Sequence, residues 1–183
     1  HGQAIRSVDL QGQLKTEVEL SFKPNGFGLR RDGALVFSDA LQRKVYQWKS
    51  GQLDLLADLT GSTVFCLSDG LLDAHDRLYI GDIGYNFWDP NQQPVDTCVI
   101  ARVDPDGQTR VAAQGLHFPN GMALSADGGT LIVAECMGHR LSAFDVATDG
   151  SLSGRRVYAD LPAAVHPDGI ALDAEGAVWL ANP

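Results

Sequence analysis

Short stretches of alternating hydrophobic and polar residues, separated by turn-forming residues, run through the whole chain. Four segments share one plan, in which Asn or Asp precedes a glycine, an apolar stretch follows, and a turn leads into a second apolar stretch. They are PNGFGLRRDGALVFSD from Pro24, SDGLLDAHDRLYIGD from Ser68, PNGMALSADGGTLIVAE from Pro119 and PDGIALDAEGAVWLAN from Pro167. Apolar residues at helical spacing never persist beyond a turn or two, so the pattern predicts an all-β chain.

The four segments recur at a nearly constant interval. Their first glycines are separated by 44, 51 and 48 residues, the length of a four-stranded propeller blade. Third strands are expected at 44–48, 98–104 and 140–146, and a shorter fourth strand after each. The chain is therefore expected to form repeated antiparallel sheets of four strands.

A second glycine falls seven residues after the first in three of the four units. Gly33, Gly128 and Gly176 occupy this place, where a tight hairpin requires positive φ. The second unit departs from the others, because Arg77 stands there instead.

The units at the two ends of the chain are incomplete. Strands at 4–10 and 16–20 are interpreted as the outer half of a first blade, and the last unit stops after its second strand at Asn182. The fold class is accordingly predicted as a six-bladed β-propeller, of which residues 1–183 cover half of one blade, three whole blades and half of another. Because such an array leaves open edges unless its ring closes, we expect the chain to be part of a longer protein.

The net charge of the chain disfavours some classes of binding partner. With 14 Lys and Arg against 23 Asp and Glu, the formal charge is −9, which disfavours nucleic acid and anionic membranes as partners. Three scattered cysteines support neither a disulfide framework nor a thiolate zinc site. No apolar run is long enough to span a bilayer and no signal segment is visible, so a cytoplasmic location is the default expectation, with an upstream signal peptide left open.

Oxygen-bearing side chains recur at one end of the predicted sheets. The starts of the first strands and the ends of the second strands share a face in every unit. This face collects Asn25, Asp69, Asn120 and Asp168 at strand starts, and Asp39, Asp82, Glu135 and Asn182 at strand ends. Converging carboxylate and amide oxygens are what a hard cation such as Ca²⁺ requires. The alternative is that each Asn-Gly or Asp-Gly pair only forms a turn, since repeats copy turns as readily as sites.

The stretch from Phe118 to Pro183, with FPNGMALSADG and HPDGIALDAEG, resembles the senescence-marker-protein/gluconolactonase/luciferin-regenerating-enzyme family. Weaker similarity extends back to about residue 4. The resemblance implies a six-bladed propeller with a divalent cation in its channel, Ca²⁺ first and Zn²⁺, Mn²⁺ or Mg²⁺ as alternatives. It also implies that Asn120 and Asp168 are metal ligands, that Asp168 is the catalytic base, and that a further glutamate ligand lies before residue 1.

Three further residues are assigned to substrate binding. Ser68 and Asp69 stand where many family members have Asn-Asp before the glycine, and Ser68 replaces an asparagine that often faces substrate or metal. Cys66 aligns with an arginine that contacts sugar-acid lactones in some members, which argues against aldonolactone specificity. Glu135 is the third residue assigned to substrate binding. It could also support the metal site from behind the ligands, or be a solvated turn residue.

Two groups of residues near this face have open roles. His117 and His166 are interpreted as loop histidines rather than as acids or bases, and His139 is expected to be exposed. The segment 84–97 is either an insertion that shapes the substrate pocket or a surface loop whose Phe87 and Trp88 pack against blade edges.

The function predicted from these residues is metal-dependent hydrolysis of a small lactone or ester, with no other bound cofactor. The absence of nucleophile-elbow, phosphate-loop and zinc-helix motifs leaves no rival catalytic signature. The alternatives are a propeller that serves as a binding or scaffolding module and a strictosidine-synthase-like relative. The sequence carries no signal for the oligomeric state.

Overall fold

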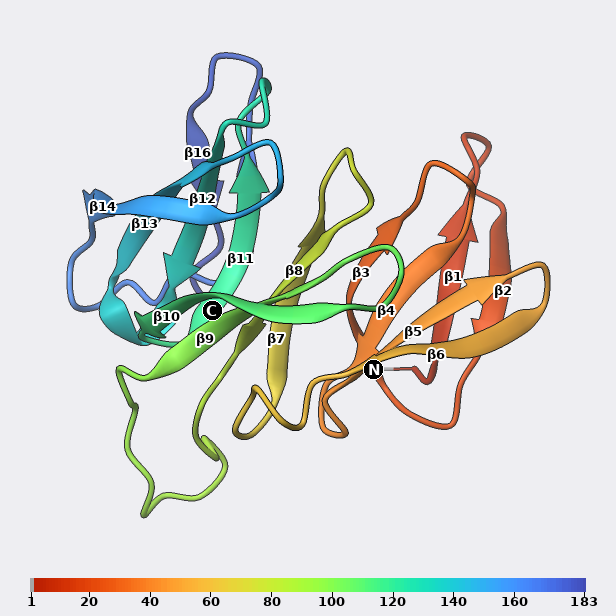
Figure 1. Ribbon diagram of the computed structural model, residues 1–183, viewed down its shortest axis with the longest axis horizontal. Coiled ribbons are helices and arrows are strands. Elements are labelled where there is room, and N and C mark those ends of the chain that lie inside the picture. The colour runs from red at the N-terminus through yellow and green to blue at the C-terminus, as the bar shows by residue number, and fades with distance from the viewer. Residues whose placement is uncertain (1) are drawn as a thin grey trace.

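The computed structural model describes residues 2–183 as five antiparallel sheets of neighbouring strands (Figure 1). Two short sheets enclose three sheets of four strands, and within each sheet the strands follow chain order. The strands are β1 (Ala4–Val8), β2 (Leu14–Glu19), β3 (Pro24–Leu29), β4 (Leu35–Asp39), β5 (Lys44–Lys49), β6 (Gln52–Asp58), β7 (Leu67–Leu72), β8 (Leu78–Asp82), β9 (Cys98–Val103), β10 (Thr109–Leu116), β11 (Pro119–Leu124), β12 (Thr130–Glu135), β13 (Arg140–Val146), β14 (Leu152–Asp160), β15 (Ile170–Leu172) and β16 (Val178–Leu180).

This arrangement confirms the predicted all-β propeller architecture of half, whole and half units. The first strands of successive units, β3, β7, β11 and β15, pack side by side, and the later strands of each sheet extend away from them. The one helical element is a single 3₁₀ turn, Cys136–Gly138, among the residues that the structure describes. Over the same residues, no helix is long and apolar enough to cross a membrane. That β1 and β2 are the outer strands of a first blade stays a proposal.

The hairpin glycines adopt the predicted conformation. Gly33, Gly128 and Gly176 have φ values of 81°, 72° and 85°, which non-glycine residues rarely adopt. In the second unit Asp76 takes the left-handed position, with φ of 61°, so Arg77 is free to start the return toward β8. Asp tolerates this conformation better than most residues do, which explains how one unit dispenses with glycine.

The first glycine of the third unit serves a different purpose. Gly121 lies inside β11 rather than in a turn, and a Cβ on it would lie 2.4 Å from the carbonyl oxygen of Asp168. Its own N–H donates to that oxygen at 3.0 Å. The glycine therefore allows two adjacent units to approach backbone to backbone, and this Asn-Gly pair lies in a strand rather than in a turn.

Apolar side chains fill the spaces between neighbouring sheets. One cluster joins Val36 and Val45 of the β3–β6 sheet to Leu67 and Ile80 of the β7–β10 sheet. A second joins Tyr79 and Ile100 to residues of the β11–β14 sheet, such as Leu131 and Phe144. The β7–β10 sheet thus buries both of its faces against its neighbours, as the continuous apolar run of its second strand predicts.

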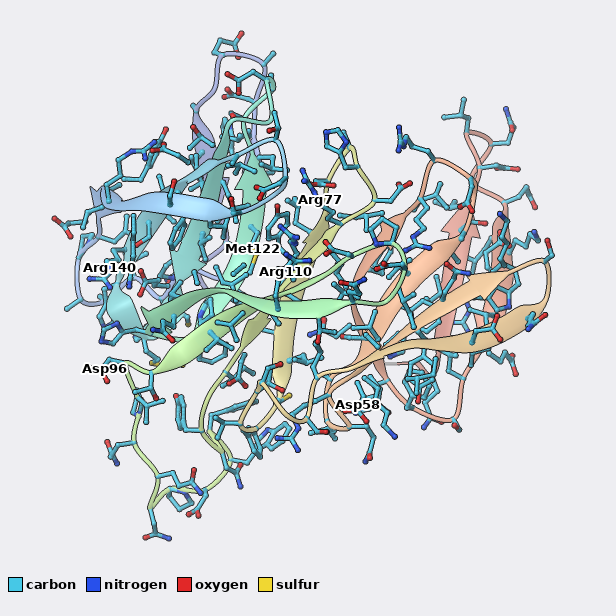
Figure 2. All side chains as sticks on the ribbon, in the orientation of Figure 1. Asp58, Arg77, Asp96, Arg110, Met122 and Arg140 are labelled. Carbon is cyan, nitrogen blue, oxygen red and sulfur yellow. The ribbon has the colours of Figure 1, made fainter. Side chains whose placement is uncertain are left out.

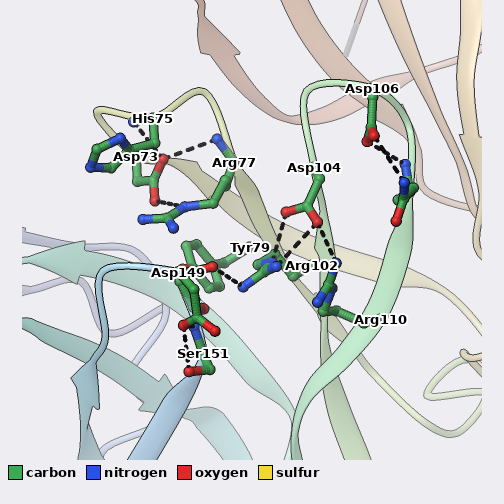
Figure 3. Close-up of polar contacts among 12 residues, drawn as sticks. Asp73, His75, Arg77, Tyr79, Arg102, Asp104, Asp106, Arg110, Asp149 and Ser151 are labelled. Carbon is green, nitrogen blue, oxygen red and sulfur yellow. Dashed lines mark hydrogen bonds and ion pairs between the residues drawn. The ribbon is translucent and has the colours of Figure 1, made fainter.

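Buried polar links also cross from the β7–β10 sheet to the β13–β14 turn. Arg77, labelled in Figure 2, donates from Nε to Asp73 at 2.6 Å and from Nη1 to the carbonyl oxygen of Thr148 at 2.9 Å. Arg102 donates to the carbonyl oxygen of Asp149 at 2.8 Å, and the Tyr79 hydroxyl donates to that of Gly150 at 2.8 Å. Figure 3 shows this cluster at the junction of the two sheets.

Replacing Tyr79 with phenylalanine is expected to lower the free energy of unfolding by about 1 kcal/mol, because one buried hydrogen bond between units is lost. Chemical denaturation measures the change. Tyr46→Phe, which alters a tyrosine stacked on Phe22, is the matched control and is expected to change the free energy by less than about 0.5 kcal/mol. Equal losses in the two variants would contradict a specific role for the link between sheets.

Candidate functional site

Asn120 and Asp168 meet at the start of the first strands of adjacent units. The amide Nδ2 of Asn120 donates to Oδ1 of Asp168 at 2.5 Å. The backbone bond from Gly121 to Asp168 holds the two segments in this register. Asn120 is buried and Asp168 half-buried. The two residues predicted to share a cation therefore lie within hydrogen-bonding distance, although they are 48 positions apart in the chain.

Asp69 occupies the corresponding place in the preceding unit, inside β7. Burial raises the pKa of its carboxyl group, and the negative charge of Asp168 raises it further. Two carboxylates thus act on one another across the face formed by β7, β11 and the segment before β15. Asn25 of β3 turns instead toward its neighbouring unit, with Nδ2 3.5 Å from the carbonyl oxygen of Leu67.

Ser68 is buried, and its hydroxyl donates to the carbonyl oxygen of Pro119. This bond links β7 to the first residue of β11, which directly precedes Asn120. The proton of the Ser68 hydroxyl is therefore used in a hydrogen bond between two strands. The assignment of Ser68 to substrate binding stays a prediction, and so does that of Asp69.

Side chains at the ends of the second strands hold the segments that lead into the site. Asp82 at the end of β8 accepts the backbone N–H of Val64 at 3.0 Å, upstream of Asp69. Asn182 accepts the backbone N–H of His166 at 2.7 Å, two residues before Asp168. Each of these side chains therefore fixes the approach of a loop rather than contributing an isolated oxygen.

Glu135, at the end of β12, likewise holds the backbone of the segment before Asn120. Its carboxylate accepts the backbone N–H of His117 at 2.9 Å. Arg140, labelled in Figure 2 and drawn near the start of β13, donates to it at 2.9 and 3.0 Å, and Arg155 donates at 2.9 Å. The Ser142 hydroxyl also donates to it.

The carboxylate of Glu135 is fully buried, with 0% of the residue exposed. Burial by itself raises the pKa of Glu135, but the hydrogen bonds from Arg140, Ser142 and His117 and the charge of Arg155 outweigh it and lower the pKa to about 2. The expectation of a solvated turn residue is therefore wrong. Its assignment to substrate binding remains untested, but all the contacts described for it are with the protein.

Arg140 and Arg155, which donate hydrogen bonds to Glu135, were not among the residues predicted for the site. A signal for Arg140 was present, because Glu135 and Arg140 flank a short connection and face one another in the β12–β13 pairing. Opposite charges at facing positions of a hairpin attract one another. Arg155 carried no such local signal, since it comes from β14, twenty residues away in the chain.

The three histidines lie along the edge of the site. His117 has Nδ1 3.4 Å from Oε2 of Glu135. His139 is half-buried rather than exposed as predicted, because its Nδ1 lies 2.9 Å from the carbonyl oxygen of Val165. Its ring meets that of His166 edge-on, with centroids 4.6 Å apart. The interpretation of His117 and His166 as loop histidines stays a prediction.

Asn120 and Asp168 fit a hard divalent cation by the chemistry of their side chains, because the amide Oδ1 of Asn120 and the carboxylate of Asp168 are both oxygen ligands. The amide Nδ2 of Asn120 is the atom that faces Asp168. Over residues 2–183 there is no group of three or more His, Cys, Asp or Glu side chains that could hold a metal ion. Cys136 lies nearby, but burial and then the charge of Asp168 raise the pKa of its thiol, which disfavours a thiolate ligand. The chain thus offers two oxygen ligands, fewer than the six to eight that Ca²⁺ takes.

The sequence of the chain matches that of a known protein family. The sequence profile described as the SMP-30/Gluconolactonase/LRE-like region matches residues 1–183. Regucalcin from Danio rerio is 23% identical over 154 residues, which are 83% of this chain and 51% of that protein. The chain therefore spans about half the length of this curated relative.

Solved structures agree on the fold. A gluconolactonase from Xanthomonas campestris superposes with a TM-score of 0.78 at 24% identity, over 99% of this chain and 63% of that one. Regucalcin from Agrobacterium tumefaciens, described as a calcium-binding protein, gives 0.79 at 21% identity, over 98% and 60% of the two chains. Since the profile matches the whole chain and the fold agrees, the chain belongs to the SMP-30/gluconolactonase/LRE-like family.

Proposed function

We propose that the protein is a metal-dependent hydrolase of the gluconolactonase type, and that this chain carries one side of its active site. The observation that carries the proposal is the contact of Asn120 with Asp168 at the starts of adjacent units. Membership of the family and the named activity of the Xanthomonas relative support the reaction class. The chain spans 51% of the Danio rerio regucalcin and 63% of the Xanthomonas gluconolactonase, so the activity of a complete protein is part of the proposal.

Asn120 and Asp168 would hold the cation together with a glutamate expected before residue 1. When bound, Ca²⁺, or Zn²⁺, Mn²⁺ or Mg²⁺ in its place, would act as a Lewis acid that polarises the carbonyl of the substrate. Asp168 would accept a proton from the water that attacks the carbonyl carbon, after which the ring C–O bond would break and the leaving oxygen would take up a proton. Asn120 orients the Asp168 carboxylate through its amide N–H.

The proposed substrate is a small lactone or ester rather than a macromolecule. The formal charge of −9 opposes the approach of nucleic acid and of anionic membranes. Carboxylates gathered around the site, among them Asp69 and Asp168, attract a cation to the same face.

Removal of divalent cations from the complete polypeptide is expected to abolish hydrolysis of its lactone substrates, because the cation is required to stabilise the oxyanion. A panel of lactones is assayed after treatment with a chelator and again after Ca²⁺ is restored. A loss of at least about 100-fold that Ca²⁺ reverses is expected, in line with the loss of one oxyanion-stabilising group. Full activity in the chelated protein would contradict the proposal.

The same assay separates the alternatives. If a folded, Ca²⁺-supplied protein hydrolyses no lactone or ester, the binding-module or strictosidine-synthase-like alternative replaces the hydrolase. A search for bound small molecules and protein partners then becomes the next experiment, since propellers host many functions.

A further inference from the structure

A cavity of about 590 Å³ opens beside the starts of β3 and β7, under the loop that joins β8 to β9. Its volume lies in the range of roughly 300–1,000 Å³ that is typical of small-molecule sites. Ile83, Phe87 and Trp88 contribute apolar lining, together with Cys66. The polar lining residues are Gln3, Ser21, Lys23, Asn25, Asp39 and Gln42. Asn25 belongs to the set of residues at the first-strand starts, so the cavity adjoins the face that carries the candidate site.

Two large aromatic side chains remain exposed at this cavity. Phe87 and Trp88 are 42% and 60% exposed, although both come from a loop that packs against the sheets. Their rings contact one another with centroids 4.4 Å apart, and Trp88 meets Phe65 edge-on at 5.6 Å. Adjoining apolar side chains exposed beside a cavity are typical of a ligand-binding surface.

Hydrogen bonds within the loop hold these rings in place. The backbone N–H of Trp88 donates to Oδ1 of Asn86 at 3.1 Å, and that of Asn86 donates to Oε1 of Gln92 at 2.8 Å. A further bond runs from the backbone N–H of Asp89 to the carbonyl oxygen of Asn86 at 3.0 Å. These bonds fix the loop that carries both rings, which lowers the entropy cost of binding a ligand there.

Phe118 connects this surface to the candidate site. Its ring lies 6.1 Å from that of Phe87 and 6.4 Å from that of Tyr85, centroid to centroid. Phe118 has φ of 56°, a left-handed conformation that is a rare outlier for a bulky residue. It stands two residues before Asn120, so a strained backbone carries both an aromatic contact with the loop and a residue of the site.

The wall of the cavity formed by Ile83, Phe87 and Trp88 favours an apolar group, although polar side chains line other parts of the cavity. A buried hydroxyl that finds no hydrogen-bond partner is unfavourable, and the side chains of Ile83 and Phe87 offer no partner. Cys66 adds little polarity, because burial raises the pKa of its thiol to about 11 and keeps it neutral. An alkyl or aryl group suits these walls better than a sugar chain does.

We propose that this cavity binds the apolar substituent of the substrate, and that the protein therefore prefers alkyl- or aryl-substituted lactones over sugar-acid lactones. The inference rests on the proposed function for the reaction and on the cavity for the substrate class. Phe87 and Trp88 act as specificity-determining residues that contact the substituent, while Asn120 and Asp168 face the ring carbonyl.

The test compares γ-butyrolactone, γ-nonalactone and glucono-δ-lactone with the complete polypeptide. The value of kcat/KM for γ-nonalactone is expected to exceed those of the other two by at least about tenfold, since burial of the methylenes of its pentyl group stabilises the complex. Trp88→Ala is expected to lower kcat/KM for γ-nonalactone about tenfold more than it lowers kcat/KM for γ-butyrolactone. Trp88→Phe, which keeps an aromatic ring, is the matched control and is expected to retain most of the preference.

Binding is measured separately from catalysis. A γ-pentyl lactam, which resists hydrolysis, is titrated by calorimetry against wild type and Trp88→Ala, with unsubstituted pyrrolidinone for comparison. Tighter binding of the pentyl lactam that depends on Trp88 supports the cavity even if no lactone is hydrolysed, in which case the proposed function alone fails. Equal binding of the two lactams, or equal losses of γ-nonalactone and γ-butyrolactone hydrolysis in Trp88→Ala, would overturn the inference. Phe87→Ala carries the same comparison if Trp88→Ala does not fold.

Discussion

Asp168→Asn is expected to lower kcat for lactone hydrolysis by about 10²- to 10⁴-fold, the contribution typical of a general base. Asparagine keeps the size of the side chain, and its carbonyl oxygen still accepts the N–H of Asn120, but it takes up no proton from water. The fold is expected to survive, because the backbone bond between Gly121 and residue 168 does not involve the side chain. Steady-state kinetics at saturating Ca²⁺, together with thermal unfolding, measure both expectations.

Glu175→Gln is the matched control for Asp168→Asn. Glu175 is an exposed acid in the turn that leads to β16, and its replacement removes the same charge seven residues away from the site. Activity of this variant is expected to stay within twofold of wild type. If Asp168→Asn retained more than a tenth of wild-type kcat, the base would have to be another group.

The strands and hairpins of this chain could be predicted because their signals are local. Alternation of apolar and polar residues sets each strand, and Gly33, Gly128 and Gly176 supply the positive φ that each hairpin requires. The recurrence of these signals near every 48 residues then indicates how the sheets repeat. The adjacency of Asn120 and Asp168 follows from the same repeat, since equivalent positions of neighbouring units lie side by side.

Contacts between units could not be predicted in this way. The bonds from Arg77 and Tyr79 to the β13–β14 turn join residues 71 positions apart, and no local pattern marks either partner. The same holds for Arg155, whose contact with Glu135 depends on how β14 packs at the end of β12. The rings of Phe87 and Trp88 lie in an irregular loop, whose conformation depends on side-chain bonds from Asn86 and Gln92.

Glu135→Gln is expected to destabilise the protein by about 3 kcal/mol at pH 7, the free-energy equivalent of a pKa lowered from 4.5 to about 2. The glutamine leaves Arg140 and Arg155 without the negative charge that they share in a buried place. Because the pKa in the folded state lies below that in the unfolded state, the contribution of Glu135 is fully present above pH 4.5 and is lost as the pH falls toward 2.

The difference in free energy of unfolding between wild type and Glu135→Gln should therefore shrink steadily between pH 4.5 and pH 2. Urea denaturation at a series of pH values measures it, and Glu19→Gln, which changes an exposed glutamate of β2, is the control that should show little difference at any pH. A difference that does not vary with pH would show that shape rather than charge determines the role of Glu135. The Glu135 carboxylate accepts the backbone N–H of His117, three residues before Asn120, and Asn120 contacts Asp168. If the charge of Glu135 determines its role, the Glu135→Gln variant should therefore lose Ca²⁺ affinity together with stability.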